Sequence, residues 1–322
     1  MSTTVDSNAS AQPEFLRPDD LAAILAEARS EIANAIVGHE DAVQLMLVAA
    51  LARGHVLLEG PPGTAKTLLA QAMARVLGAK FQRVQFTPDT TPTDLIGTVL
   101  VRNGEVFLER GAVFTNVLLA DEINRTPPRV QAALLEAMQE RHISVKGRTF
   151  FIDPPFFVMA TQNPYEHEGV YAITESQLDR FVFKIDLEYG SEESEIRMLS
   201  LPHRGVIPDM LGEVSALLGE RGFLVAQEAV DEVAVPAGAA RAAVRIVRFT
   251  RESPDVELGA SPRAALHLMT AAKALALTNG RATVEVDDVV RLAPNVLAHR
   301  LVCDSPREVV AEAIRAGLEA AA

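Results

Sequence analysis

The sequence predicts an α/β protein with a parallel β-sheet, helices on both faces of that sheet, and an all-α domain at the C-terminus. Short apolar runs alternate with amphipathic helical segments in the first part of the chain. Polar residues follow directly after these runs, and helical patterns dominate beyond Gly190. In parallel α/β sheets, ligands bind at the carboxyl ends of the strands. We therefore expect the functional residues at those strand ends.

Four short apolar runs have the length and composition of buried strands. They cover residues 55–59, 117–120, 156–160 and 181–187. Two further segments, 99–109 and 143–152, are predicted to be β-hairpins, because Asn103-Gly104 and Lys146-Gly147 supply turn residues. A bare α/β sheet needs neither hairpin.

Apolar residues at helical spacing predict the helices. The first predicted helix begins at Pro18, and the second covers 40–51. A third helix, 68–78, follows a glycine-rich loop. The remaining predicted helices cover 192–201, 210–218, 238–250, 262–277 and 286–298. We divide the chain into a flexible N-terminal tail (1–18), an αβα core that carries the hairpins (19–200) and a helical domain (201–322).

Composition limits the classes of function. Of the 322 residues 48% are hydrophobic, which allows a large core and excludes a disordered chain. The 30 Lys and Arg residues against 43 Asp and Glu give a net charge of −13, which makes nucleic acid an unfavourable main partner. The single cysteine, Cys303, cannot form an intrachain disulfide and fits a reducing compartment. With no secretory signal and no apolar stretch of about 18 residues, we expect a cytoplasmic protein without membrane insertion.

The strongest functional signal is the octapeptide Gly60-Pro-Pro-Gly-Thr-Ala-Lys-Thr67, which lies between a predicted strand and a predicted helix. It fits the phosphate-loop pattern G-x-x-x-x-G-K-[ST], with Ala65 in place of the last glycine. In such a loop, backbone N–H groups hold phosphates, the lysine reaches the β- and γ-phosphates, and the hydroxyl binds Mg²⁺. Ala65 is compatible with this role if its backbone is helical.

A second signal is the pair Asp121-Glu122 at the end of the apolar run 117–120. Carboxylates at the end of a buried strand are unfavourable without partners, and a metal ion is one such partner. Asp121 would hold Mg²⁺ through water, and Glu122 would polarise the attacking water. The alternative is a helix cap followed by a surface acid.

Three further polar residues have a functional interpretation and a structural one. Asn163 follows a predicted strand and could orient water against a γ-phosphate, or simply form an Asn-Pro turn. Arg180 could act on a nucleotide of its own chain or of a neighbour, or pair with Asp179. Arg263 lies in the first turn of a predicted helix, where a cation is unfavourable unless an anion such as phosphate binds there. The alternative for Arg263 is an ordinary exposed arginine.

In this order, the motifs resemble those of AAA+ ATPases and, more narrowly, of the MoxR family in the helix-2-insert group. The segments that carry the resemblance are 60–67, 86–98, 118–141, 160–181 and 259–264. The resemblance implies an AAA+ P-loop NTPase core followed by an all-α lid domain. It also accounts for the hairpins, one of which would interrupt the second helix while the other precedes sensor 1.

The resemblance also implies the roles of individual residues. The residues expected to contact nucleotide are Val37, Gly38, Gly60, Pro61, Pro62, Gly63, Thr64, Ala65, Lys66, Thr67 and Leu68. The residues expected to hold Mg²⁺ are Thr67 and Asp121. The expected catalytic residues are Glu122, Asn163 as sensor 1, Arg180 as arginine finger and Arg263 as sensor 2. The implied cofactors are ATP and Mg²⁺, and Val37 and Gly38 would contact adenine.

By this resemblance the chain would form a homo-oligomeric ring, a hexamer, with ATP between subunits. Arg180 of one subunit would complete the site of the next. MoxR relatives are associated with activating or maturing partner proteins, commonly ones with a von Willebrand factor A domain, and with metal-cofactor insertion. The expected function is therefore ATP-driven remodelling of a client protein that the hairpins contact.

Two other functions fit parts of the sequence. Replicative helicases share the helix-2-insert design, and Lys146 and Arg148 could face a nucleic-acid channel. The net acidity of the chain and the absence of an appended nucleic-acid module argue against such a motor. A nucleotide-gated binding protein with little turnover would need neither Glu122 nor Asn163.

Overall fold

The central feature of the computed structural model is a five-stranded parallel sheet. The described residues are 18–102, 105–145, 147–165, 169–200, 203–204, 207–208 and 211–319. The strand order is β2-β5-β8-β1-β9, and each neighbouring pair is parallel. The strands are β1 (Val56–Glu59), β2 (Phe81–Gln85), β5 (Val117–Asp121), β8 (Phe157–Gln162) and β9 (Phe183–Asp186). The predicted α/β class is confirmed.

Successive residues of each central strand enter two different cores, one on each face of the sheet. On β1, Val56 and Leu58 belong to the first core and Leu57 to the second. The helices beside the sheet are α1 (Pro18–Ala35), α2 (Glu40–Leu51), α3 (Lys66–Val76), α4 (Pro92–Ile96) and α5 (Pro128–Glu140). The first core contains α1, α2 and α3, and the second contains α4 and α5. Burial on both faces explains why the strands are continuous apolar runs.

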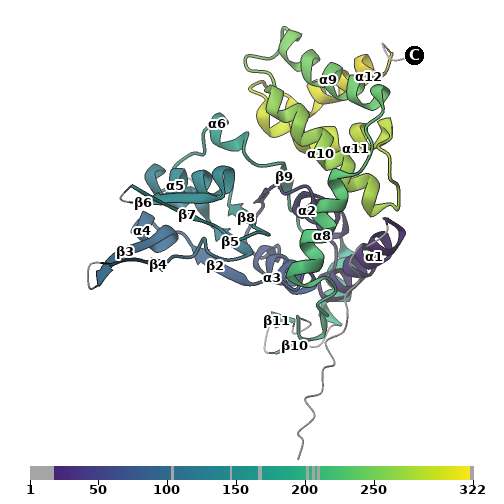
Figure 1. Ribbon diagram of the computed structural model, residues 1–322. Helices are drawn as coiled ribbons and strands as arrows, with labels where there is room; N and C mark the ends of the chain where they lie inside the picture. Colours follow the sequence, from purple (N-terminus) through teal and green to yellow (C-terminus); the bar gives the residue numbers. More distant parts are fainter. Residues whose placement is uncertain are drawn as a thin grey trace, which may run out of the picture.

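The C-terminal part of the chain is helical, as predicted. Its helices are α8 (Gly219–Asp231), α9 (Ala237–Glu252), α10 (Pro262–Thr278), α11 (Val286–Leu297) and α12 (Pro306–Glu319). Helix α10 contacts α1 and α2, α8 contacts α2, and α11 contacts β9. The helical domain therefore shares its core with the first face of the sheet. Figure 1 shows α9 to α12 gathered together, away from α5 and the hairpins.

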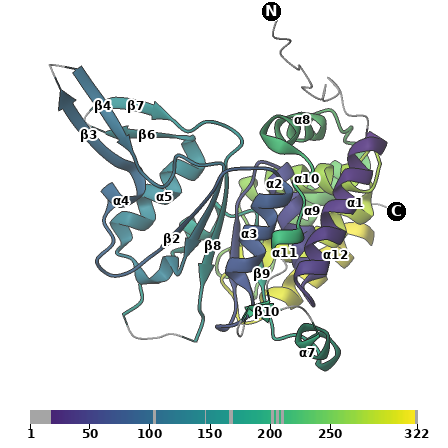
Figure 2. The same cartoon turned by 90° about the horizontal axis from the view of Figure 1, so that it is seen from below.

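Two antiparallel hairpins extend from the other side of the sheet. Strand β3 (Gly97–Arg102) pairs with β4 (Glu105–Arg110), and β6 (His142–Val145) pairs with β7 (Arg148–Phe151). Figure 2 shows both hairpins near each other, at the end opposite the helical domain. Both predicted hairpins are thus confirmed, although residues 103–104 and Lys146 lie outside the described residues.

The predicted helix 210–218 is wrong. Where this segment is described, only the short η2 (Leu211–Glu213) is helical, and α8 begins later, at Gly219. Val214 and Leu218 are both buried, so an irregular segment that packs on the core has the apolar spacing of a helix. The remaining elements are η1 (Ile123–Arg125), α6 (Glu175–Leu178), α7 (Glu192–Leu199), β10 (His203–Arg204), β11 (Ile207–Pro208) and η3 (Ala298–Arg300).

The N-terminal tail predicted for residues 1–18 lies outside the described residues except for Pro18, which begins α1. Among the helices that the structure describes, none combines the length and the apolar character needed to cross a membrane.

His55 is a buried titratable group at the start of β1. Its Nδ1 accepts the N–H of Val158 at 3.0 Å, so Nε2 carries the proton and donates to the carbonyl of Met138 at 3.2 Å. Burial is the main reason why the pKa of His55 is lowered from 6.5 to about 4. Only the neutral ring satisfies both hydrogen bonds, because protonated Nδ1 cannot accept.

This geometry predicts a loss of stability in mild acid. Below its ordinary pKa of 6.5, His55 binds a proton in the unfolded chain but not in the folded one until the pH reaches about 4. His55 alone therefore lowers the free energy of unfolding by about 2 kcal/mol between pH 7 and pH 5. Urea unfolding at both pH values measures the total loss, to which His267 and His299 also contribute because burial lowers their pKa values. In His55→Asn, whose amide oxygen still accepts the Val158 N–H, the loss should shrink, and an unchanged loss would contradict the assignment.

Candidate nucleotide-binding site

The loop between β1 and α3 has a backbone that requires glycine at two points. A Cβ at Gly60 would come within 2.3 Å of the carbonyl oxygen of Leu187. Gly63 has a φ of +87° and no atom within 4 Å of an added Cβ. The loop therefore packs tightly where it leaves the sheet and is open where a ligand would approach it.

The expectation that Ala65 has a helical backbone is wrong. Its φ is 56° and its ψ is 20°, which is the left-handed region, and α3 begins at the next residue, Lys66. This conformation costs an L-residue about 1–2 kcal/mol, which explains why the phosphate-loop pattern has glycine here. Strain of this kind persists where the surrounding structure enforces it, commonly at functional sites.

Lys66 lies back over the loop. Its Nζ donates to the carbonyl oxygens of Gly60 and Pro61, both at 2.8 Å, and lies 3.4 Å from the hydroxyl of Thr64. The first N–H groups of α3 have no partner within the helix and carry its positive partial charge. The ammonium group and the helix N-terminus together form a site for an anion.

Asp121, at the end of β5, has partners for both carboxylate oxygens. The hydroxyl of Thr161 donates to Oδ1 at 2.6 Å, and Arg83 donates to Oδ2 from Nη2 at 2.7 Å and from Nε at 3.1 Å. Neither partner was predicted from the sequence. Arg83 comes from the partly exposed edge strand β2, and Thr161 continues a buried strand without a distinguishing pattern.

Glu122 is held by the same threonine. Its backbone is left-handed, with a φ of 59° and a ψ of 48°, and its N–H donates to the Thr161 hydroxyl at 2.9 Å. Its carboxylate pairs with Arg125 at 3.3 Å and makes no cap for the following η1 turn. The Thr161 hydroxyl thus donates to Asp121 and accepts from Glu122, and it fixes the two acids relative to each other.

Mg²⁺ fits the oxygen donors at this edge of the sheet. No group of three His, Cys, Asp or Glu side chains able to hold a metal occurs in the described part of the chain. Mg²⁺ does not need such a group, because it is usually bound by one or two carboxylates together with substrate phosphates. Asp121, the last residue of β5, and the hydroxyl of Thr67, in the first turn of α3, would supply oxygen ligands of this kind.

Asn163 follows β8, at the same edge. Its side-chain oxygen accepts the N–H of Tyr165 at 3.1 Å, which is the hydrogen bond of the turn that sequence analysis gave as the alternative. The oxygen therefore stabilises the turn that leads away from β8.

A cavity of about 100 Å³ lies beside the loop. The residues of the predicted set that line it are Val37, Gly63, Thr64, Ala65 and Leu68. Tyr189 and Met198 also line it and were missed, because they come from the segment before α7 and from α7 itself. Gly38 adjoins this region, since a Cβ there would lie 3.1 Å from the hydroxyl of Ser194. The mainly apolar walls suit the flat ring of a base.

Arg180 and Arg263 lie elsewhere. Both line a separate cavity of about 190 Å³ that also includes Gly54 and His55. These last two residues precede β1, whereas the phosphate loop follows it. The arginines and the loop of one chain are therefore at opposite ends of the same strand.

The arginine cavity is strongly cationic. Arg53 and Arg141 line it together with Arg180 and Arg263, and its described lining contains no Asp or Glu. The Nε of Arg180 is buried, with no hydrogen-bond partner among the described residues. Burial, followed by the charge of Arg300, lowers the pKa of His267 in the lining to about 3, so this ring adds no charge near neutral pH. Clustered guanidinium groups of this kind suit an anion such as phosphate.

Asp179, the alternative partner for Arg180, binds other groups. It pairs with Arg300 at 2.8 Å and accepts the hydroxyl of Ser261 at 3.0 Å. Arg300 is buried and also donates to backbone carbonyls of the segment that follows Asp179. This network joins the segment that carries Arg180 to the first turn of α10, which carries Arg263. The two arginines therefore keep a fixed relation to each other.

This chain is similar to known proteins. The family model "ATPase family associated with various cellular activities (AAA)" matches residues 55–183, and the model "AAA lid domain" matches residues 248–316. Chaperone MoxR1 of Mycobacterium tuberculosis is 48% identical over 283 residues, which cover 84% of this chain and 74% of that protein. Protein MoxR of Methylorubrum extorquens is 35% identical, with coverage of 90% and 92%.

A crystal structure described as that of a "putative ATPase" from Cytophaga hutchinsonii superposes with a TM-score of 0.83. It is 34% identical and covers 93% of this chain and 96% of its own. This chain thus has a phosphate loop, paired acids at the end of β5 and a helical C-terminal domain. Two of its relatives carry the name MoxR. The chain belongs to the MoxR family of AAA+ ATPases.

Proposed function

We propose that this protein hydrolyses ATP as a homo-oligomeric ring, a hexamer, with each ATP between two subunits. The observation that supports this most directly is that the phosphate loop and the pair Arg180 and Arg263 occupy opposite ends of β1. A site divided in this way is complete only when the loop of one subunit faces the arginines of the next. Repeated head-to-tail contacts of this type form a closed ring when the rotation between neighbouring subunits closes.

In the proposed site, one subunit binds the nucleotide. The loop N–H groups and Lys66 hold the phosphates, and the apolar cavity beside Val37 and Leu68 takes the base. Thr67 and Asp121 would hold Mg²⁺, which neutralises charge on the phosphates. When nucleotide binds, the Lys66 ammonium group would leave the two backbone carbonyls and donate its hydrogen bonds to the phosphates instead.

The same subunit would position the attacking water. Glu122 lies directly after Asp121, and the Thr161 hydroxyl fixes its backbone, so the carboxylate can orient and polarise a water near the terminal phosphate. Asn163 would act at the same edge through its amide group. Arg180 and Arg263 of the neighbouring subunit would stabilise the charge that develops on the transferred phosphoryl group.

We further propose that hydrolysis drives remodelling or activation of a client protein in the cytoplasm. A relative that is 48% identical carries the name Chaperone MoxR1. The projecting hairpins β3–β4 and β6–β7 lie apart from the helical lid and are the elements proposed to contact the client (Figure 2). We also propose that the client has a von Willebrand factor A domain and that the protein acts in complex maturation or metal-cofactor insertion. The proposed domain boundaries are residue 18, between tail and core, and residue 200, between core and lid.

Mixed oligomers test the shared site. Arg180→Ala should bind ATP, because its own loop is intact, but lose turnover by about 1000-fold or more if the arginine acts as a finger. Glu122→Gln should also bind ATP and fail to hydrolyse it. Mixing the two proteins creates interfaces with an intact Glu122 and an intact Arg180, so phosphate release should partly return. Arg221→Ala, at an exposed site on α8, is the control. If the mixture stays as inactive as the two separate variants, Arg180 either acts on the nucleotide of its own subunit or has no role in catalysis.

Thr161 offers a second test of the acid pair. Thr161→Val keeps the shape of the side chain but removes the hydroxyl that links Asp121 to Glu122, at a cost of about 1–3 kcal/mol in stability. Turnover should fall strongly while ATP affinity, which depends on the loop, changes little. Thr161→Ser retains the hydroxyl and should retain most of the turnover. Parental turnover in the valine variant would show that the hydroxyl bridge has no part in hydrolysis.

A further inference from the structure

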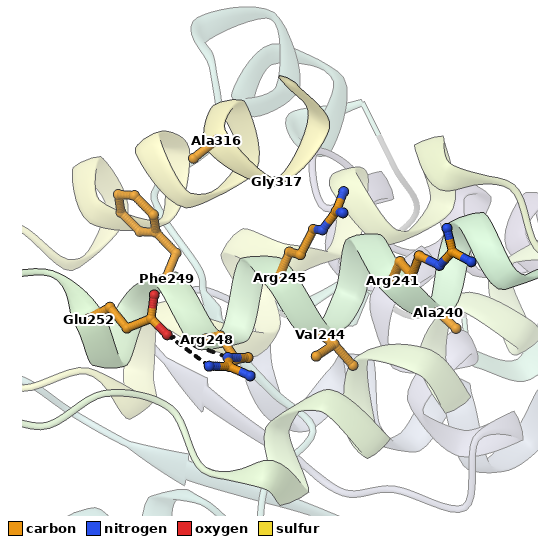
Figure 3. A pocket seen from close by; sticks show the side chains of 9 residues that line it. All are labelled: Ala240, Arg241, Val244, Arg245, Arg248, Phe249, Glu252, Ala316 and Gly317. Atoms are coloured by element: carbon orange, nitrogen blue, oxygen red, sulfur yellow. Dashed lines mark hydrogen bonds and ion pairs between the residues drawn. The ribbon is translucent and has the colours of Figure 1, made fainter. Parts of the chain in front are cut away.

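Helix α9 carries a cationic groove outside the proposed nucleotide site. The helix contains Arg241, Arg245, Arg248 and Arg251 against a single acid, Glu252, although the whole chain has a net charge of −13. The first three arginines line a groove of about 600 Å³ between α9 and the C-terminal part of α12. Figure 3 shows these side chains along α9, with Arg248 turned to pair with Glu252.

The groove also has an apolar surface. Val244 is 49% exposed, and Phe249 is partly exposed on the side of α9 that faces α12 (Figure 3). On α12, a Cβ at Gly317 would lie 2.9 Å from Cγ1 of Ile246, so the absence of a side chain lets the two helices approach closely. Figure 3 shows Val244 and Phe249 along the same length of α9 as the arginines. A partner for this groove must combine negative charge with apolar side chains.

Helix α7 has that composition. None of its eight residues is buried. Ile196 is 57% exposed and Leu199 is 77% exposed, and Glu192 and Glu195 lie on the same side of the helix. Contiguous apolar surface of this kind on a soluble protein marks an interaction site.

The two helices match in spacing as well as in chemistry. The face of α7 consists of Glu192, Glu195, Ile196 and Leu199, and the face of α9 consists of Arg241, Val244, Arg245 and Arg248. Both sets follow the helical offsets i, i+3, i+4 and i+7, so each covers about 10 Å of helix. Packed antiparallel, the two acids of α7 meet Arg248 and Arg245 of α9, and Ile196 covers Val244.

This pairing needs two copies of the chain. Helix α7 flanks the phosphate loop, where its Ser194 and Met198 line the cavity beside Gly63. Helix α9 belongs to the helical domain. Figure 2 shows α7 at an edge of the molecule, separated from α9. The two faces of one chain therefore cannot meet each other.

The positions of the two faces agree with the proposed ring. The C-terminal end of α9 adjoins the start of α10, since Arg251 donates to the carbonyl of Ala260 at 2.6 Å and the N–H of Ala260 donates to Thr250 at 3.0 Å. Arg263 lies in the first turn of α10. A neighbour that turns its phosphate loop toward Arg263 therefore brings its α7 to the side where α9 ends.

We propose that α7 of one subunit docks into the α9–α12 groove of the next subunit. The occupant of the groove is a second copy of this chain, and the inference rests on the ring described under the proposed function. The contact is head-to-tail, because the two faces are different surfaces. It adds to the interface a set of ion pairs and apolar contacts that does not involve the nucleotide.

Charge reversal tests the docking directly. In full-length Glu122→Gln protein with ATP, Arg241→Glu/Arg248→Glu makes the groove acidic, and Glu192→Arg/Leu199→Arg makes α7 basic while leaving Glu195, which lines the nucleotide cavity, unchanged. Each change alone should raise the protein concentration needed for half-assembly, measured by sedimentation velocity, by about 10-fold or more through like-charge repulsion. Mixing the two proteins should restore assembly, because every interface of an alternating ring is again complementary. One chain with all four changes should also assemble.

The control is Arg75→Glu/Arg221→Glu, an equal change of charge at exposed residues of α3 and α8, which should leave assembly unchanged. If either double variant misfolds by circular dichroism, the glutamine variants of the same residues replace it, and they should weaken assembly in the same direction. Assembly of the charge-reversed proteins at the parental concentration would overturn the docking, and so would the absence of rescue in the mixture.

Binding of a fluorescent ATP analogue separates this inference from the proposed function. Groove variants should bind ATP as the parent does, because the groove is remote from the loop. If ATP binds and rings form regardless of the charge changes, the docking is wrong while the ATPase proposal stands. If the parent binds ATP but remains monomeric, both are wrong. Normal assembly with loss of binding to an acidic client peptide would assign the groove to the client and overturn the inference.

Discussion

The left-handed turn at Ala65 that starts α3 is the constraint on which the rest of the site depends. It directs the chain from β1 into a helix whose first N–H groups face the open side of the loop, and Lys66 closes that loop through two backbone carbonyls. An alanine here accepts about 1–2 kcal/mol of backbone strain. The neighbouring strands then place Asp121, Glu122 and Asn163 at the same edge, so that the parallel sheet gathers groups that are far apart in the sequence.

The opposite end of the sheet has a different character. Guanidinium groups collect there in a cavity without acids, and a buried network around Arg300 fixes their positions. A single subunit thus has a phosphate loop at one end of β1 and four arginine side chains around a cavity at the other end. The proposed ring would join the two ends, and the proposed pairing of α7 with α9 would add contacts between the same two neighbouring subunits. Assembly and hydrolysis would then depend on one interface.

Much of this was predictable from the sequence, and the reasons for the rest are physical. Four strands of the central sheet, the strand–loop–helix order around residues 60–67 and both hairpins follow from short-range patterns, and the structure confirms them. The edge strand β2 was not predicted, because its partly exposed residues do not form an apolar run. The backbone of Ala65 was wrongly predicted to be helical, because the loop enforces a positive φ that the residue type does not indicate. Arg83, Thr161 and Arg300 were missed because their roles come from contacts between strands and helices distant in sequence. The helix predicted at 210–218 failed because buried irregular segments can have helical apolar spacing.

The central claim is that the loop before α3 binds the phosphates of ATP. Titration calorimetry with ATP and Mg²⁺ on Lys66→Ala tests it most directly, with Lys80→Ala, at a mainly exposed side chain, as the matched control. We expect affinity to fall by about 10- to 100-fold in Lys66→Ala, because a hydrogen bond from a charged group contributes about 1.5–3 kcal/mol. Circular dichroism should show an unchanged fold. A folded Lys66→Ala protein that binds ATP as tightly as the Lys80→Ala control would contradict the account.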